Sequence, residues 1–140
     1  MLPGALLPNT SLTFICRRCH VRVERTDNKF TAGLKEGDVM QFPIAHHEGL
    51  FFLPDDELKK LEEAGRVVFR YADPKTGRAG AEYAPSGALN GIAGICSEKG
   101  NILGLMPHPE RATIPHLNGG TDGIRFWNSI AGAFKERGAC

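Results

Sequence analysis

Residues 101–112 read NILGLMPHPERA, an apolar run that ends at Pro107-His108-Pro109-Glu110. Each proline fixes its own φ and favours extended backbone at the residue before it. We therefore expect a strand that continues as stiff, extended chain through Glu110. In extended chain, side chains two apart point the same way, so the carboxylate of Glu110 can reach the imidazole of His108.

An imidazole whose ring is held by a carboxylate can take up and return protons, which makes His108 and Glu110 the candidate catalytic pair. The segment alone supplies no nucleophile for such a pair. The alternative is that the two prolines end a strand and leave His108 and Glu110 as solvated loop residues.

The composition predicts one globular domain with no nucleic-acid or membrane partner. The 140 residues are 41% hydrophobic and 24% charged, and 17 Lys and Arg residues nearly balance 16 Asp and Glu residues. No run approaches the roughly 18 apolar residues of a membrane span, and the first residues lack the layout of a secretory signal. We therefore expect a cytoplasmic protein whose four cysteines are reduced thiols.

Hydrophobic periodicity and turn residues predict one long strand, several shorter strands and two helices. The expected strands are residues 11–25, 38–44, 50–53, 67–71, 92–97 and 102–106, and the expected helices are residues 55–64 and 122–137. Residues 2–10 have no expected element, and residues 72–89 are expected to form a long loop with one short strand around Glu82-Tyr83.

Two details of these elements can be predicted more closely. The apolar positions of residues 11–25 change parity midway, which indicates a bulge near Arg17-Arg18. The C-terminal helix is expected to bury one stripe of apolar side chains. That stripe consists of Ile124, Trp127, Ile130 and Phe134.

Cys16-Arg17-Arg18-Cys19-His20 matches the C-x-x-C-H string of a haem attachment site and could also begin a metal site. Cysteines three apart point to opposite faces of a regular strand, and the surrounding residues are typical of a strand. Further zinc ligands would have to come from His46 and His47, which are adjacent rather than three to five apart. We therefore expect a pair of sheet cysteines and no metal, with a haem or metal module as the less favoured alternative.

Three strings together resemble the class I glutamine amidotransferases, and within them the glutaminase subunits of phosphoribosylformylglycinamidine synthases. They are residues 43–49 (PIAHHEG), 92–96 (IAGIC) and 104–111 (GLMPHPER). Pro-His-Pro-Glu alone is shared widely among class I amidotransferases, whereas the other two strings are more specific to this branch. The match extends from about Leu2 to the C-terminal helix. His47 departs from it, because the family usually has glycine there.

The resemblance implies an α/β, flavodoxin-like sheet with helices on both sides and a Cys-His-Glu triad. His108 would transfer protons, Glu110 would orient it, and His46 and Glu48 would belong to an active-site or interface loop. The family's nucleophilic cysteine sits on a glycine-flanked elbow upstream of residues 2–6, where this sequence has only Met1. We therefore expect residues 1–140 to be the C-terminal part of one amidotransferase domain, lacking the N-terminal strands, the elbow and the nucleophile.

The resemblance also implies glutamine as substrate, with a large synthase subunit and a small accessory subunit as partners. ATP and Mg²⁺ would be used by the large subunit, because this sequence has no glycine-rich phosphate loop and is expected to bind no cofactor itself. The alternative is a non-catalytic binding or regulatory fragment that docks on the synthase subunit.

Overall fold

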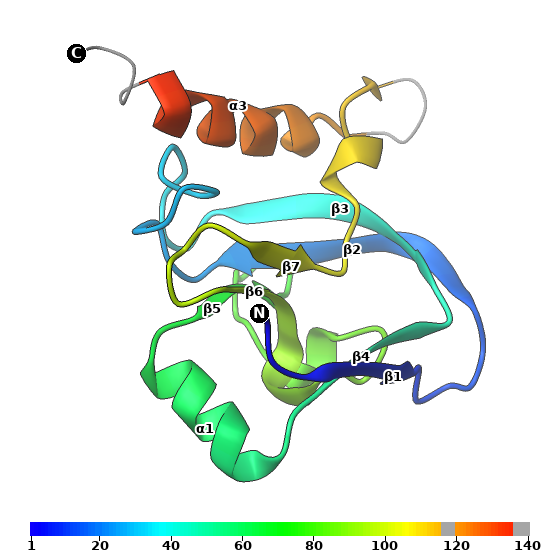
Figure 1. The fold of residues 1–140 in the computed structure, drawn as a ribbon. Coiled ribbons are helices and arrows are strands. Elements are labelled where there is room, and N and C mark those ends of the chain that lie inside the picture. The colour runs from blue at the N-terminus through cyan, green and yellow to red at the C-terminus, as the bar shows by residue number, and fades with distance from the viewer. Residues whose placement is uncertain (116–119, 136–140) are drawn as a thin grey trace.

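A five-stranded antiparallel sheet lies at the centre of the fold in a computed structural model that describes residues 1–115 and 120–135. In spatial order its strands are β3 (Val39–His46), β2 (Ile15–Val23), β5 (Val67–Tyr71), β6 (Ile92–Cys96) and β7 (Leu103–Leu105). The sheet is curled, with helix α3 (Asp122–Lys135) on one side and helix α1 (Asp55–Glu63) on the other (Figure 1). The expected α/β class with helices on both sides is confirmed.

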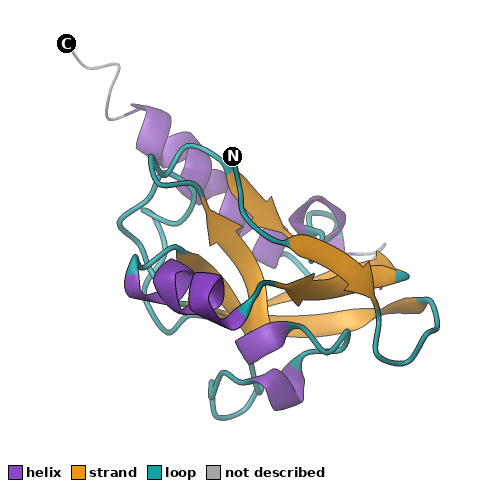
Figure 2. Ribbon diagram, turned by 60° about the horizontal axis from the view of Figure 1, so that its bottom comes forward, coloured by secondary structure: helices purple, strands orange, loops and turns teal. Residues whose placement is uncertain are grey.

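A second, two-stranded sheet is formed by β1 (Ala5–Pro8) and β4 (Glu48–Phe52), which run antiparallel with Ala5 opposite Phe52. Figure 2 shows this ribbon beside the main sheet. The expectation of no element before Ser11 is wrong. β1 is four exposed residues long and pairs with a strand some forty residues further along the chain, so its own sequence carries little periodic signal.

The long strand β2 pairs with β3 without any shift of register, from Ile15 opposite His46 to Arg22 opposite Val39. The predicted bulge near Arg17-Arg18 is therefore wrong. The parity change has a simpler cause, because the strand turns its odd-numbered apolar side chains to the core, from half-buried Ile15 to buried Cys19, Val21 and Val23. The apolar residues that precede the strand, Leu12 and Phe14, are exposed.

Helix α1 confirms the helix expected at residues 55–64. Pro54 lies at its N-cap, where a missing N–H costs nothing, and Gly65 follows its end with a positive φ of 62°. The helix buries Leu58 and Leu61. They pack in a small core cluster with Leu53, Val67, Ile92 and Ile95.

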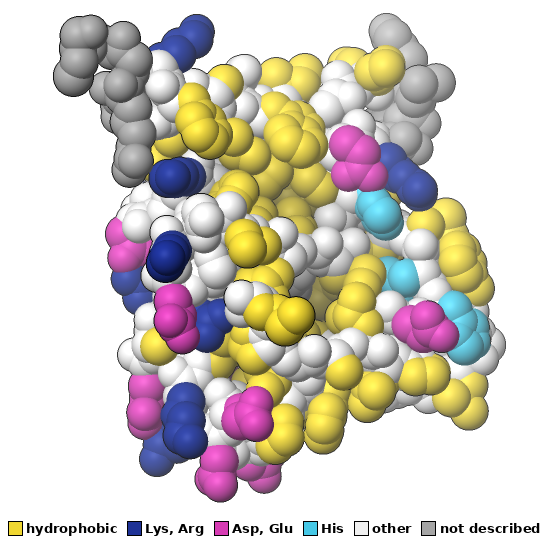
Figure 3. Space-filling view, viewed as in Figure 1, with side chains coloured by type: hydrophobic (Ala, Val, Ile, Leu, Met, Phe, Trp, Pro, Cys, Tyr) yellow, Lys and Arg dark blue, Asp and Glu magenta, His cyan; other side chains and the backbone are white. Residues whose placement is uncertain are grey.

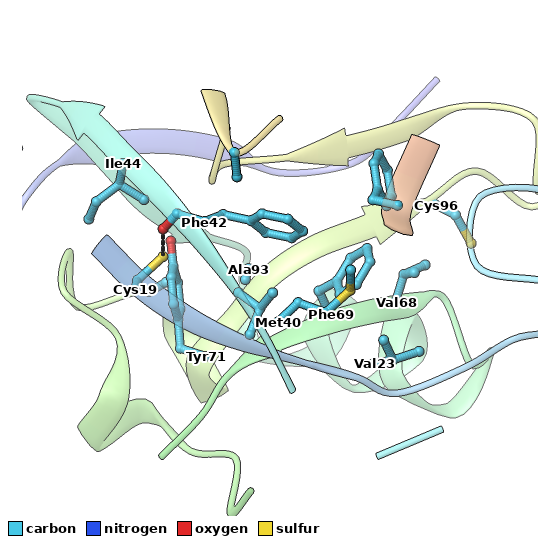
Figure 4. Close-up of a cluster of buried hydrophobic side chains, with 14 residues drawn as sticks. Cys19, Val23, Met40, Phe42, Ile44, Val68, Phe69, Tyr71, Ala93 and Cys96 are labelled. Atoms are coloured by element: carbon cyan, nitrogen blue, oxygen red, sulfur yellow. Dashed lines mark hydrogen bonds between the residues drawn. The ribbon is translucent and has the colours of Figure 1, made fainter. Parts of the chain in front are cut away.

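The main core lies between the sheet and α3, and Figure 4 shows its packed side chains. The predicted stripe of α3 is wrong: Ile124, Trp127 and Phe134 are exposed and Ile130 is half-buried. The buried residues are instead Gly123, Phe126 and Ser129, each of which lies one residue before a predicted position. Small residues at two of these positions let α3 come close to the 3-10 turn at residues 109–111 and to the loop at Gly33, which a purely hydrophobic pattern does not reveal. The expected helix end at residues 136–137 lies outside the described residues.

The remaining segments follow the expectations in part. β6 and β7 form the expected hairpin, with Gly94 opposite Leu105. The short strand expected around Glu82-Tyr83 is wrong, because residues Ala81–Tyr83 form a 3-10 helix. No helix within residues 1–115 and 120–135 is long and apolar enough to cross a membrane.

Candidate functional site

The proline-bracketed segment follows the edge strand β7 and turns into a short 3-10 helix, η3 (Pro109–Arg111). The extended backbone expected through Glu110 is therefore wrong from Pro109 onward. Pro109 occupies the first helical position, where proline is tolerated because its missing N–H has no partner to lose. Before this turn, the backbone N–H of His108 donates to the carbonyl of Pro43 on β3 at 2.8 Å.

His108 and Glu110 nevertheless meet. His108 Nδ1 lies 2.7 Å from Glu110 Oε1, and both side chains are partly exposed. A carboxylate only accepts hydrogen bonds, so Nδ1 carries a proton, and in the neutral form of the ring Nε2 has a free lone pair. Glu110 also has the guanidinium of Arg111 nearby, at 3.8 Å. The predicted contact is present, and the catalytic role of the pair stays a prediction.

The turn that carries this pair is held against the start of α3. The backbone N–H of Gly123 donates to the carbonyl of Ala112 at 3.0 Å. A β-carbon on Gly123 would stand 2.0 Å from the carbonyl oxygen of Pro109, so only glycine lets the helix come this close. The small residue on the buried face of α3 therefore helps to fix the position of η3.

His46 ends β3, and its side chain is buried rather than displayed in a loop. Its Nδ1 lies 2.9 Å from Asn9 Oδ1, while its Nε2 is buried and has no hydrogen-bond partner among the described residues. Burial lowers the pKa of His46, and the nearby His108 lowers it further. The structure thus brings His46 close to the His108–Glu110 pair, as a neutral imidazole.

Glu48 begins β4, where its side chain is exposed. Asn9, in contrast, has no exposed surface and was missed by sequence reasoning, which treated residues 2–10 as a connection. The one available signal is its residue type, because asparagine side chains often hydrogen-bond backbone groups in turns. In Figure 3 the histidine side chains visible on this face gather along its right-hand edge, with acidic side chains beside them.

The described cysteines are poorly placed to serve as nucleophiles. Cys19 is buried in β2, where its thiol donates to the carbonyl of Phe42, and burial raises its pKa to about 12. Burial also raises the pKa of Cys96. Cys16 is exposed in β2, without the strand-to-helix turn expected of a nucleophile elbow. Cys140 lies outside the described residues.

The C-x-x-C-H string does not converge on one point. Cys16 is exposed while Cys19 faces the core, and His20 Nε2 lies 3.0 Å from the side-chain nitrogen of Gln41. Within residues 1–115 and 120–135, no group of three or more His, Cys, Asp or Glu side chains is placed to hold a metal ion. The geometry therefore does not support a haem or metal module here.

An apolar hollow of about 300 Å³ lies between the N-terminal residues and the β6–β7 hairpin. Its lining carries no charged side chain and consists of residues 2–6, Phe51, residues 92–95 and residues 104–106. A site for the polar amino acid glutamine needs groups that pair with its ammonium and carboxylate. The described lining of this hollow supplies no charged side chain for such pairing, although the hollow borders the strand that leads to His108.

Comparison with known proteins identifies relatives that match most of the chain. Residues 3–122 match the family model described as CobB/CobQ-like glutamine amidotransferase domain. The phosphoribosylformylglycinamidine synthase subunit PurQ of Koribacter versatilis is 50% identical over 137 residues, which are 98% of this chain and 58% of that protein. PurQ of Aquifex aeolicus is 45% identical over 130 residues, which are 93% of this chain and 56% of that protein.

The fold is also similar to a solved structure, that of PurLQS from Thermotoga maritima. The two superpose with a TM-score of 0.77 at 37% sequence identity, over 95% of this chain and 54% of that chain. The chain therefore spans little more than half the length of the proteins it matches.

Proposed function

Because this chain belongs to the family of CobB/CobQ-like glutamine amidotransferase domains, we propose that it is part of a glutaminase that supplies ammonia for purine biosynthesis. The relatives described above, at 45% and 50% identity, are PurQ subunits of phosphoribosylformylglycinamidine synthase. The structural observation that supports a catalytic role is the 2.7 Å contact between His108 Nδ1 and Glu110 Oε1.

The proposed reaction begins with a cysteine thiolate that attacks the side-chain amide carbon of glutamine. The resulting oxyanion collapses to a thioester and releases ammonia, and water then cleaves the thioester to give glutamate and the free thiol. His108 Nε2 would take the thiol proton and deliver it to the leaving ammonia, and in the second step it would take a proton from water. Glu110 would hold the ring so that Nε2 faces these groups and would stabilise the imidazolium.

The ammonia would be used by a large synthase subunit to form formylglycinamidine ribonucleotide, with a small accessory subunit in the same complex. ATP and Mg²⁺ would be bound by that large subunit, because this sequence has no glycine-rich phosphate loop. A cytosolic location fits this proposed pathway and the free thiols of Cys16, Cys19 and Cys96.

The proposal assigns the nucleophile to none of the described cysteines, and it is supported by the burial of two of them and by the place of the third within a strand. Members of a catalytic triad act as a unit, so His108 and Glu110 alone should give essentially no turnover. We therefore expect the purified 140-residue chain to release no glutamate from glutamine. Robust, cysteine-dependent glutamate release by this chain would contradict that expectation.

A chimaera tests the catalytic proposal directly. Residues 1–140 would replace the matched part of the Koribacter versatilis relative, which keeps the rest of that protein unchanged. We expect the chimaera to release glutamate and His108→Ala to lower kcat about 10²-fold or more, as for removal of a general base. Exposed Lys59→Ala is the matched control and should leave kcat unchanged. A folded chimaera whose kcat is unaffected by His108→Ala would refute the role of His108.

The absence of a suitable thiol among the described residues also favours a second candidate, a non-catalytic fragment that docks on the synthase subunit. Capture of the purified large synthase subunit by the 140-residue chain, together with no activity in the chimaera, would favour this candidate.

A further inference from the structure

Asn9 is fully hydrogen-bonded near the proposed site, although it lies outside every motif of the sequence. It follows β1 and has no exposed surface. Its backbone N–H donates to the carbonyl of His47 at 2.8 Å, which ties the end of β1 to the turn between β3 and β4. Its side chain hydrogen-bonds residues on both sides of that turn and the residue Thr13 that follows β1.

The hydrogen bonds to backbone groups fix which way the Asn9 amide points. Its NH₂ group donates to the carbonyls of Thr13 at 2.8 Å and His46 at 2.9 Å. Its Oδ1 accepts from the backbone N–H of Gly49 at 3.1 Å. Turning the amide over would set NH₂ against that N–H and Oδ1 against two carbonyls, so the orientation has no alternative.

This orientation fixes the tautomer of His46. Nδ1 lies 2.9 Å from Asn9 Oδ1, which can only accept, so Nδ1 carries the ring proton. Nε2 therefore has a bare lone pair, and it is buried without a partner among the described residues. Protonating Nε2 would place an N–H and a full charge in a site where the described residues offer no acceptor, which is costly in a buried position.

The ring is also held flat against the backbone of Gly49. A β-carbon on Gly49 would come within 2.3 Å of Nδ1 and Cε1 of His46, so there is no room for a side chain here. Asn9 and Gly49 thus hold the imidazole from its edge and from its face. The ring is fixed both in position and in protonation state.

We infer that Asn9 is a positioning residue of the proposed glutaminase site: it holds His46 as a neutral imidazole protonated on Nδ1, so that no second cation stands beside His108. The inference rests on the proposed function for its catalytic consequence. His108 must become an imidazolium when it takes up a proton, and a charged His46 nearby would oppose that step by like-charge repulsion.

The other charged groups around His46 come from three directions. Arg17 on β2 faces the same side of the sheet, opposite Ile44, while Glu48 begins the next strand. Glu110 lies beyond His108 on η3. Burial and His108, and none of these side chains, are what lower the pKa of His46.

Nitrogen NMR of the full chain tests the tautomer without any activity. With ¹⁵N-labelled histidine, and His46→Gln to assign the signals, we expect His46 at pH 7 to show a protonated Nδ1 and a bare Nε2. Observation of the Nε2–H tautomer, or of a charged His46 at pH 7, would overturn the inference even if the chain is a glutaminase.

Asn9→Asp tests the positioning role. It keeps the size of the side chain but sets a carboxylate against Nδ1, which should raise the pKa of His46. In the chimaera we expect kcat to fall at least tenfold at pH 6.5 and to recover as the pH rises and His46 loses its proton. Asn128→Asp, which adds the same charge on the exposed face of α3, is the matched control and should change neither signal nor rate.

A folded Asn9→Asp variant with an unchanged pH profile would overturn the positioning role. If Asn9→Asp fails to fold, the same experiment can be made with Asn9→Ser, which keeps a small polar group but removes the fixed amide. We then expect NMR to show a mixture of His46 tautomers, and a single Nδ1–H tautomer in that variant would refute the role of Asn9.

Discussion

The carboxylate of Glu110 reaches the imidazole of His108 across one turn of 3-10 helix, with 2.7 Å between Oε1 and Nδ1. A carboxylate in this place fixes the ring direction and stabilises a proton taken up at Nε2. It is half exposed, so water screens part of its effect. Its contribution should therefore be smaller than that of a fully buried partner.

Glu110→Gln is expected to lower kcat of the chimaera by about 10- to 100-fold, because the amide can present its NH₂ group to Nδ1 and favour the wrong tautomer. KM should change little, since Glu110 is proposed to touch the histidine and not glutamine. Steady-state glutamate release checks both values. Exposed Glu57→Gln on α1 is the matched control, and an equal loss in both variants would contradict the role of Glu110.

The corrected face of α3 gives a second prediction. Phe126 is buried and packs against the rings of Phe42 and Phe69, with centroids 6.2 and 6.0 Å apart. Phe126→Ala should reduce the free energy of unfolding by about 3–5 kcal/mol, as expected for a large core side chain. Ile124→Ala, on the exposed face, should cost about 1 kcal/mol or less. Urea denaturation measures both losses. A larger loss of unfolding free energy in Ile124→Ala than in Phe126→Ala would contradict the assigned face.

The sequence predicted the strands and helices whose signals are local. Residues 67–71 are rich in β-branched and aromatic side chains, and residues 55–64 have a proline at the start and a glycine after the end, so both elements were expected within a residue or two. The His108–Glu110 contact was also expected, although the backbone reaches it through a turn and not through extended chain.

The missed features depend on partners far along the chain. β1 forms by pairing with β4. The side chain of Asn9 is buried and hydrogen-bonded because His46 and Gly49, thirty-seven and forty residues later, lie against it. The buried face of α3 was misassigned because close approach to η3 selects Gly123, which has no hydrophobic side chain to reveal it. Such choices are made by tertiary packing and leave no local pattern.

The two cysteines of β2, Cys16 and Cys19, should differ sharply in reactivity. The thiol of Cys19 is buried and its pKa is raised to about 12, so almost no thiolate forms at pH 8. Cys16 is exposed on the other face of β2. Brief treatment of the folded chain with iodoacetamide, followed by peptide mass spectrometry, should therefore find label on Cys16 and not on Cys19. Equal labelling in the folded chain would contradict the assigned faces, and unfolding in urea should make both residues reactive.

The buried His46 predicts a stability that depends on pH. Its pKa is lowered in the folded chain, whereas an unfolded histidine titrates near about 6.5. The unfolded state therefore binds more protons over this window, and the stability that His46 provides is present above about pH 6.5 and is lost as the pH falls below it. Urea unfolding at pH 7.5 and 5.5 should show a smaller loss in His46→Gln than in the original chain. An equal loss of stability in His46→Gln and in the original chain would show that the pKa of His46 is not lowered in the folded state.

Two glycines in different surroundings should respond oppositely to the same substitution. Gly49→Ala would place its β-carbon 2.3 Å from the ring of His46, which must move and so loses its hydrogen bond to Asn9. We expect a cost of about 1–3 kcal/mol, typical of overpacking in a core. A β-carbon added to Gly132 in α3 would have no atom within 4 Å apart from its chain neighbours and the backbone of its own helix, so Gly132→Ala should stabilise the chain by about 0.4–1 kcal/mol through the unfolded state.

Thermal unfolding of the two glycine variants checks these signs, and the histidine NMR spectrum should change only for Gly49→Ala. The helical position of Gly132 makes it the matched control, because alanine there adds the same methyl group without touching the imidazole. A Gly49→Ala variant that kept both the stability and the His46 signals of the original chain would show that Gly49 does not hold the ring in place.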